Sequence, residues 1–447
     1  MNSNKIRYWS ITVALAGFLF GFDTVVISGA NQPIKELWNT TPFFHGTFIM
    51  SMALWGTVIG ALFGGIPSDK FGRKKTLFWI GVLYFASAIG SALAPDPYTF
   101  SFFRFIGGLG VGASSVAAPT YISEISSANN RGKLVALYQF MIVFGILIAF
   151  ISNYTLAGVG GTNDWRYMLG IEGLPALAYS VMVLGVSESP RWLALKKKDH
   201  AAALQVLQSV DPATAQNKLR EIEEDIEPQG QHAGLFSKKY NRPIMLAFLI
   251  AFFNQLSGIN FILYYAPELL EKAGFAGSES LSSSISIGGI NLIFTMLGMF
   301  LIDKLGRRQL MYIGSFGYLI GLSGTAICFM QGSSPTVLLS FILVFIASHA
   351  IGQGAVIWVF ISEVFPNQVR AFGQSFGSFI HWIFAAIITL ITPIFIDKDQ
   401  GIFGDNPWPV FAFFAFMMFL QLLFVWRIMP ETKGKTLEEL EKELIRE

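Results

Sequence analysis

The stretch DKFGRKK, residues 69–75, recurs as DKLGRRQ at residues 303–309. Two further pairs keep the same order along the chain: EISSANNR (124–131) with EVFPNQVR (363–370), and SESPRW (187–192) with MPETKG (429–434). Similar elements in the same order indicate that one structural unit occurs twice. The sequence therefore predicts two parallel halves, each of which places its repeated loops on the same side of the molecule.

Composition assigns these halves to a lipid environment. The 447 residues are 53% hydrophobic and 13% charged, with a mean hydropathy of +0.53, whereas a soluble domain carries roughly 25% charged residues. A single cysteine, Cys328, excludes an internal disulfide and a cysteine metal cluster. Apolar windows predict twelve membrane-spanning helices. They cover residues 8–29, 45–66, 75–94, 99–122, 133–156, 167–187, 243–266, 282–302, 309–330, 337–362, 371–396 and 408–429.

Lysine and arginine predict how these spans are oriented. If both termini are cytoplasmic, only Lys35, Arg166, Lys272 and Lys398 of the 31 Lys and Arg residues lie outside, and Arg104 lies within the fourth span. That asymmetry follows the positive-inside rule. We therefore expect cytoplasmic termini.

The polar segment 190–242 separates the two halves. It contains KKKDH (196–200) and KLREIEEDIE (218–227), whose helical periodicity and paired charges indicate short surface helices. We expect a six-helix bundle over 1–189, a cytoplasmic linker over 190–242, and a second bundle with a cytoplasmic tail over 243–447. Repeated halves of this kind are typical of transporters whose substrate site lies at the interface between them.

Ionisable residues inside the predicted spans are candidates for function, because charge at bilayer depth is costly. They are few, namely Asp23, Arg104, Glu172, His349 and His381. Asp23, in GFDTVVIS, has Arg104 as its natural partner. A carboxylate exchanges protons at physiological pH and an arginine does not, so the pair suits proton coupling. A static buried ion pair explains the same residues, and chemistry alone does not separate the two.

The repeated loops carry matched charges that predict two sets of ion pairs. Loop basicity alone does not explain carboxylates repeated in both halves, so we expect ion pairs that hold the inner side closed when the outer side is open. The alternative is ordinary loop charge. The residues are Asp69, Arg73, Glu124 and Arg131 in the first half, and Asp303, Arg307, Glu363 and Arg370 in the second.

Taken together, the motifs resemble the sugar porter branch of the major facilitator superfamily over nearly the whole chain. The resemblance implies an all-α membrane protein with twelve transmembrane helices in two pseudo-symmetric six-helix bundles. It is carried by GFDTVVISGA (21–30), GGIPSDKFGRKK (64–75), RFIGGLGVG (104–112), ESPRW (188–192), NQLSGIN (254–260), DKLGRR (303–308) and PETKG (430–434).

The same resemblance implies a sugar pocket made of neutral amides and aromatic rings. Amides match sugar hydroxyls as both donors and acceptors, and tryptophan offers a flat apolar surface to C–H faces. Hydrogen bonding between helices is the alternative role for these amides. The implied pocket residues are Phe20, Gln139, Asn254, Gln255, Asn260, Asn291, Trp358, His381 and Trp382. Ser257-Gly258 is a break where a helix could unwind beside a ligand.

The family resemblance also implies roles for other positions. Proton-coupled members of the family carry Asp at position 23, and Glu172 matches a membrane acid of the bacterial symporters. Tyr264 and Tyr265 resemble the extracellular gate. This chain departs from the pattern at Asn254, where relatives carry Gln, at Ile146, at Ala355, and at His381, where relatives carry Gln or Asn. A structural role is the alternative for Glu172 and His381, and it is the role that we expect for His349. These departures leave the identity of the sugar open.

The sequence thus predicts a proton-coupled importer of a monosaccharide, a hexose or a pentose, that works by alternating access. An uncoupled facilitator, a non-transporting sugar sensor and a multidrug exporter are the alternatives. GGLGVGAS (107–114) lacks the GK[ST] ending of a phosphate loop, and small-residue helix packing explains it better. We expect a monomer in the bacterial inner (plasma) membrane that binds sugar and protons, has no cofactor, metal or nucleic-acid partner, and is not an enzyme.

Overall fold

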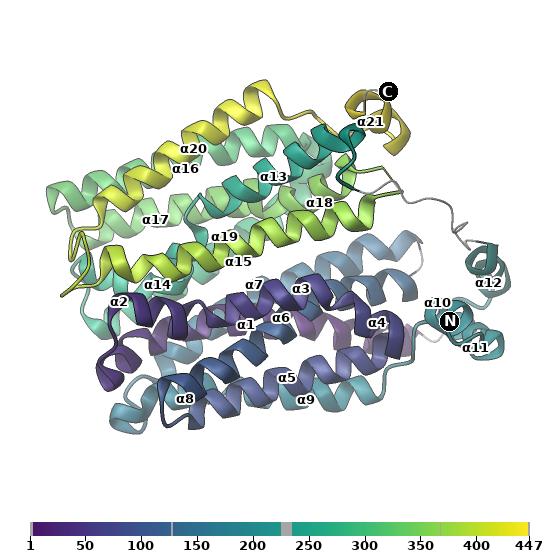
Figure 1. Cartoon of the computed structure of the whole chain (residues 1–447), viewed down its shortest axis with the longest axis horizontal. Coiled ribbons are helices and arrows are strands. Elements are labelled where there is room, and N and C mark those ends of the chain that lie inside the picture. Colours follow the sequence, from purple (N-terminus) through teal and green to yellow (C-terminus); the bar gives the residue numbers. More distant parts are fainter. Residues whose placement is uncertain (1–2, 127, 225–234, 367, 446–447) are drawn as a thin grey trace. The chain divides into compact units, whose positions relative to one another are not determined.

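A computed structural model describes residues 3–126, 128–224, 235–366 and 368–445, and every regular element within those ranges is a helix (Figure 1). Within these ranges, eleven helical segments are long and apolar enough to cross a membrane. The pair Pro42–Met50 and Met52–Phe63, bent by 42°, makes twelve if it counts as one span. The predicted all-α class with twelve spans is therefore confirmed.

Among the described residues, nine α-helices precede the polar segment. They are α1 (Ser3–Trp38), α2 (Pro42–Phe44), α3 (Met52–Phe63), α4 (Gly65–Phe71), α5 (Arg73–Leu93), α6 (Pro97–Ile125), α7 (Ala128–Leu156), α8 (Asp164–Gly170) and α9 (Gly173–Leu184). A π-helical turn, His45–Met50, joins α2 to α3, and a 3-10 turn, Gly161–Asn163, precedes α8.

In the described part of the polar segment, three short helices agree with the predicted surface helices. They are α10 (Pro190–Leu195), α11 (His200–Val210) and α12 (Ala215–Glu224), followed by a 3-10 turn, Lys238–Tyr240. The remaining helices are α13 (Asn241–Gln255), α14 (Ile259–Lys272), α15 (Gly277–Leu305), α16 (Arg307–Gln331), α17 (Pro335–His349), α18 (Ala355–Val364), α19 (Arg370–Ile396), α20 (Trp408–Arg427) and α21 (Leu437–Leu444). A second π-helical turn, Ala350–Gly354, lies between α17 and α18.

Contacts divide the chain into two compact units, which we describe separately. Unit 1 comprises Met1–Thr24, Trp55–Ala149 and Arg166–Gln231, and unit 2 comprises Val25–Leu54, Phe150–Trp165 and His232–Glu447. Segments 25–54 and 150–165 therefore group with the later helices, whereas the sequence repeat assigns them to the first half. The division into 1–189, 190–242 and 243–447 stays a prediction from the repeat.

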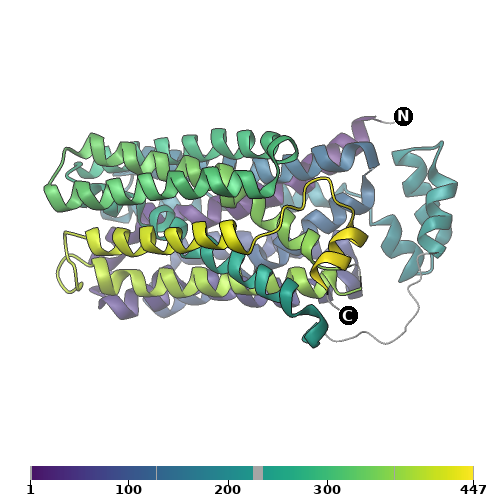
Figure 2. The ribbon, with the colours of Figure 1, turned by 90° about the horizontal axis from the view of Figure 1, so that it is seen from above.

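Within unit 1, small residues let α3 and α6 approach closely. A side chain added at Gly60 would meet the Leu109 carbonyl, and one added at Gly112 would meet the Thr57 carbonyl. The interpretation of residues 107–114 as a helix-packing stretch is thereby confirmed. The helices α10 to α12 pack on one another at one end of unit 1 (Figures 1 and 2), and Trp192 of α10 contacts Asp69 of α4.

Within unit 2, α13 and α14 form one broken span. Leu256, Ser257 and Gly258 separate them, and Gly258 has a φ of +84°, a conformation that glycine adopts without strain. Ser257 Oγ donates to the Asn254 carbonyl at 2.6 Å and closes the end of α13. The predicted unwinding at Ser257-Gly258 is present.

Candidate functional site

Buried charges meet in unit 1 around Arg104 on α6. Its Nη1 donates to Asp23 Oδ1 at 2.6 Å, and its Nη2 donates to the Asp23 carbonyl oxygen at 3.2 Å. Both residues are only 2% exposed. Gly107, three residues further along α6, lies close to the pair, because a Cβ added there would lie 3.6 Å from Asp23 Oδ1. The structure thus brings the predicted partners together.

Glu172, immediately before α9, belongs to the same cluster. Its side chain is fully buried and interacts with both Asp23 and Arg104. Among the described residues its Oε1 has no hydrogen-bond partner. With both carboxylates ionised, the three groups carry one net negative charge, and one bound proton makes them neutral. The cluster therefore has the composition of a site that can take up and release a single proton.

Two of the predicted pocket residues lie in unit 1. Phe20 on α1 is partly buried and packs against the apolar core of this unit. Gln139 on α7 is also partly buried. Both therefore keep part of their side chains exposed in unit 1.

The other predicted amides gather at the break between α13 and α14 in unit 2. Gln255 Nε2 donates to Asn254 Oδ1 at 2.9 Å, and Asn260 Nδ2 donates to Gln255 Oε1 at 2.8 Å. All three residues are buried. Asn291, on α15, is also buried, and its Oδ1 accepts from Thr295 of the same helix at 3.4 Å. The break thus assembles three of the four predicted amides of unit 2.

Aromatic rings surround His381 on α19 beside these amides. Gln255 Nε2 lies 3.2 Å from the ring nitrogens of His381. The His381 ring centroid is 4.9 Å from that of Trp358 and 4.7 Å from that of Trp382. Trp358 is 38% exposed, whereas Trp382 is buried. The predicted combination of amides with tryptophans is therefore present in unit 2.

The predicted gate tyrosines lie one turn beyond the amides on α14. Tyr264 and Tyr265 are each 1% exposed, and Tyr265 Oη donates to the Thr389 carbonyl of α19 at 2.8 Å. Tyr265 has φ −117° and ψ 17°, which kinks α14 at this point. The kink therefore lies directly beside a contact between α14 and α19.

His349 has a simpler environment. It is buried at the end of α17, and its Nδ1 lies 2.6 Å from the Tyr318 hydroxyl of α16. That contact fits the structural role expected for this histidine.

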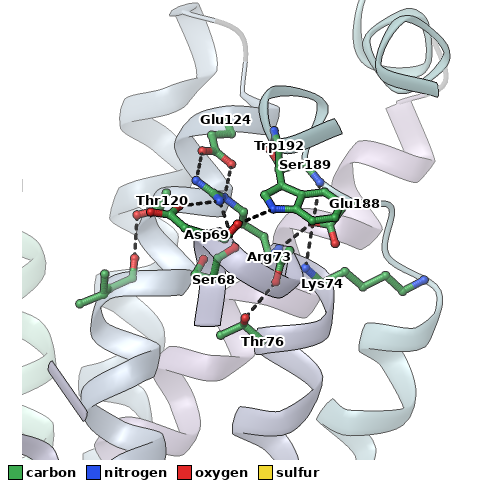
Figure 3. A network of polar contacts seen from close by, with 12 residues as sticks. Ser68, Asp69, Arg73, Lys74, Thr76, Thr120, Glu124, Glu188, Ser189 and Trp192 are labelled. Carbon is green, nitrogen blue, oxygen red and sulfur yellow. Dashed lines mark hydrogen bonds and ion pairs between the residues drawn. The ribbon is translucent and has the colours of Figure 1, made fainter. Parts of the chain in front are cut away.

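The predicted loop charges form a compact network at the start of α5 (Figure 3). Arg73 Nη1 lies 2.8 Å from Asp69 Oδ1, and its Nη2 and Nε donate to the two oxygens of Glu124 at 2.9 and 3.0 Å. The Arg131 side chain lies outside the described residues. Trp192 Nε1 donates to the Asp69 carbonyl at 2.8 Å and fastens α10 to the network.

The second repeat reproduces this network in unit 2. Arg307 Nη2 lies 2.7 Å from Glu363 Oε1, and its Nη1 lies 3.3 Å from Asp303 Oδ1. Arg370 Nε donates to the Phe365 carbonyl at 3.3 Å. Three of the four predicted residues therefore meet in each set.

Two carboxylates that the sequence singled out only as repeats complete these networks. Glu188 Oε1 accepts from the backbone N–H groups of Arg73 and Lys74 at 2.8 and 3.1 Å (Figure 3). Glu431 accepts in the same way from Arg307 and Arg308, at 3.0 and 2.9 Å. Each therefore caps the first turn of a helix, where negative charge is stabilising. The matched positions of Glu188 and Glu431 in SESPRW and MPETKG were the sequence signal from which this capping role could have been predicted.

Sequence reasoning missed a further polar cluster in unit 2, which we call the Asn31 cluster: Asn31, Lys35, His45, Glu268 and Asp397. Asn31 Nδ2 donates to Glu268 Oε2 at 2.8 Å, and His45 Nε2 lies 2.7 Å from Asn31 Oδ1. Lys35 pairs with Asp397, which directly follows α19. The cluster therefore links the end of α1 to α14 and α19.

Comparison with known proteins points to one family. A family model described as "Sugar (and other) transporter" matches residues 9–444. The arabinose-proton symporter of Bacillus subtilis is 37% identical over 446 residues, which cover 97% of this chain and 94% of that protein. The D-xylose-proton symporter of Escherichia coli is 34% identical, over 98% of this chain and 96% of its own length. An inward-open structure of the E. coli xylose transporter XylE has a TM-score of 0.85 at 33% identity, covering 98% of this chain and 100% of that one.

Proposed function

Because this chain belongs to the sugar transporter family, we propose that it is a proton-coupled importer of a monosaccharide, a hexose or a pentose, that works by alternating access. It acts as a multi-pass protein of the bacterial inner (plasma) membrane with both termini in the cytoplasm. The observation that carries coupling is the buried contact between Asp23 and Arg104, joined by Glu172. The names of the two bacterial symporters support the substrate class and the coupling ion.

Sugar binding is assigned to the amides and rings at the α13–α14 break. Asn254, Gln255 and Asn260 are neutral and buried, which suits an uncharged ligand that presents hydroxyl groups. Trp358 supplies a partly exposed apolar surface for the sugar ring. Phe20, Gln139, Asn291, His381 and Trp382 complete the proposed set of sugar-binding residues.

Proton coupling is assigned to Asp23, with Arg104 and Glu172 as its partners. Arg104 stays charged throughout, so the proton binds to one of the two carboxyl groups. Binding that proton removes the net charge of the buried cluster, and a proton that binds to Asp23 also weakens the attraction between Asp23 and Arg104. A cluster that changes its contacts when it is protonated biases the equilibrium between conformations, which is what coupling requires.

Gating is assigned to two groups of contacts. The Arg73 and Arg307 networks tie helix ends together on the cytoplasmic side, where breaking them permits helix movement. Tyr264 and Tyr265 lie at the kink of α14 and act at the extracellular gate.

Uptake into proteoliposomes tests the proposal. The purified protein is offered a panel of hexoses and pentoses with and without an inward-directed proton gradient. We expect at least one sugar to accumulate above its equilibrium level only when the gradient is present. Equilibration without accumulation would identify an uncoupled facilitator, and binding without flux would identify a sensor. The absence of both binding and flux for all sugars would overturn the proposal.

A further inference from the structure

Two buried glutamines extend the proposed sugar-binding amides into the interior of unit 2. Asn254 Nδ2 donates to Gln353 Oε1 at 3.4 Å, and Gln353 Nε2 donates to Gln421 Oε1 at 2.8 Å. Gln421 Nε2 then donates to Ser315 Oγ at 2.9 Å. Gln353, Gln421 and Ser315 are completely buried. We call Asn260, Gln255, Asn254, Gln353 and Gln421 the amide chain.

All members of the amide chain point the same way. Each side-chain nitrogen donates toward Ser315, and each oxygen from Gln255 onward accepts from the preceding amide. Reversing one interior amide would oppose nitrogen to nitrogen on one side and oxygen to oxygen on the other. Each amide is thus held in its orientation by its neighbours.

The backbone supports this arrangement at Gln353. This residue lies on the π-helical turn Ala350–Gly354, and such turns occur often at functional sites. Gly352 of the turn packs directly against Gly314 of α16, where an added Cβ would lie 3.0 Å from the Gly352 Cα. That close approach brings the turn against the helix that carries Ser315. The chain of hydrogen bonds therefore joins α14, α13, the π-helical turn, α20 and α16.

The orientation of the amide chain determines which hydrogen-bond donors and acceptors remain for a ligand. Gln255 uses its two N–H groups on Asn254 and His381 and therefore offers only an oxygen lone pair. Asn254 keeps one N–H and one lone pair, and Asn260 keeps one N–H and both lone pairs of its oxygen. Among the described residues, the three amides thus offer more acceptors than donors. That pattern suits a ligand that donates several O–H groups.

We propose that Gln353 and Gln421 are positioning residues that set the selectivity among sugars by fixing the amide orientations of Asn254 and Gln255. The inference rests on the sugar site proposed above. Neither glutamine needs to touch the sugar, since each acts through the hydrogen bond to the next amide. If Gln353 is lost, Asn254 is no longer held in one orientation, and its donor and acceptor can exchange places toward the ligand.

Sugar binding to variants tests the proposal. Gln353→Met and Gln421→Met keep the length of the side chain and remove its hydrogen bonds. The readout is the ratio of Kd values for sugars that differ at one hydroxyl, D-glucose with D-galactose and D-xylose with L-arabinose. We expect one of these ratios to change by about ten-fold, the effect of one hydrogen bond of typical strength. Unchanged ratios in both variants would overturn the inference.

Matched variants separate positioning from bulk stability. Asn153 is a fully buried amide outside the chain that donates to the Val26 carbonyl at 3.1 Å, so Asn153→Leu should lower the Tm and leave the ratios within about two-fold. In its neutral, protonated form the carboxyl of Gln421→Glu accepts from Gln353 and donates to Ser315, so this variant should keep the wild-type ratios. An equal change of ratio in Gln421→Glu and Gln421→Met would contradict the proposal. If the methionine variants do not fold, Ser315→Ala removes the last acceptor with little change of volume and should shift the same ratio.

The wild-type protein separates this inference from the proposed function. A wild type that binds none of the sugars refutes the function itself. A wild type that discriminates between the paired sugars, together with methionine variants that discriminate equally well, refutes only the role of Gln353 and Gln421.

Discussion

Arg104 donates to both the side chain and the backbone of Asp23, at 2.6 Å to Oδ1 and at 3.2 Å to the carbonyl oxygen. The backbone contact does not depend on the charge of Asp23, whereas the side-chain contact does. Protonation of Asp23 therefore loosens the pair without separating α6 from α1 completely. The backbone contact therefore keeps the Arg104 guanidinium in position while its attraction to the Asp23 side chain changes.

Asp23→Asn should abolish uphill sugar accumulation and leave sugar exchange across the membrane intact. Asparagine still accepts a hydrogen bond from Arg104, but it binds no proton. Uptake driven by a proton gradient and counterflow of radiolabelled sugar measure the two activities in the same proteoliposomes. Accumulation that persists in this variant would contradict the role of Asp23. With Asp23 replaced by a neutral amide, the charges of Arg104 and Glu172 still balance one another, so the variant should fold, and sugar exchange that persists is the control for folding.

Glu172→Gln should reduce accumulation and flatten the dependence of net uptake on pH. In this variant the charges of Asp23 and Arg104 alone balance, so the buried cluster is already neutral. Uptake of a proton therefore no longer removes a net charge from the cluster. Initial rates of uptake between pH 5.5 and pH 8 test this. Glu36→Gln on α1 is the control, because Glu36 is an exposed carboxylate and its loss should leave the pH profile unchanged. Identical profiles for the wild type and Glu172→Gln would remove Glu172 from the coupling cluster.

Gly72→Ala should destabilise the protein. Gly72 has a φ of +99°, and an added Cβ would collide with the Glu188 carboxylate that caps α5. Strain of this kind costs about 1–3 kcal/mol, before the loss of the cap is counted. Gly65→Ala is the matched control, because nothing lies within 4 Å of a Cβ added there. Thermal unfolding in detergent measures both variants, and a Tm for Gly72→Ala equal to that of Gly65→Ala would show that the close contact is not needed.

The Lys35–Asp397 pair should lose its contribution to stability in acid. Burial raises the pKa of Asp397, but the hydrogen bond to Lys35 and the backbone N–H groups of Gln400 and Asp399 outweigh it and leave the pKa below the ordinary value of 3.8. A carboxyl whose folded-state pKa is depressed stabilises the fold above its unfolded-state pKa. That stabilisation is lost as the pH falls through the folded-state value.

Asp397→Asn therefore tests the pair by its dependence on pH. The variant should unfold more easily than the wild type at pH 7, by about 1 kcal/mol. The difference should shrink below about pH 4, where the wild-type carboxyl takes up its proton. Lys35→Met should give the same pattern. A Tm difference that stays constant from pH 7 to pH 3 would contradict the assignment.

Local patterns made part of this structure predictable. Hydropathy predicts the spans because each must satisfy its own backbone within lipid, and the repeat predicts matched loops. The cost of an isolated charge at bilayer depth pointed from Asp23 to Arg104. The Arg73 and Arg307 networks followed from matched spacing in the two repeats. Ser257-Gly258 signalled the break between α13 and α14, because small residues next to amides mark a place where a helix unwinds.

Other features depend on which helices meet. Asn31 and Glu268 are 237 positions apart, and no motif around either residue predicts contact with the other. Gln353 and Gln421 read in sequence as isolated polar residues in apolar helices. Their function as links in the amide chain requires the π-helical turn at Ala350–Gly354 to approach α16 and α20.

By itself, the sequence determined the class of fold and the repeated loop motifs, and it predicted the chemical types of group that we propose for sugar and proton binding, because hydropathy, spacing and the cost of buried charge are properties of short segments. Only the tertiary structure decided which amide nitrogen faces which oxygen, and which carboxylate caps which helix. Hydrogen bonds depend on distance and direction within a few tenths of an ångström. Those positions follow from the packing of helices that are far apart in the chain.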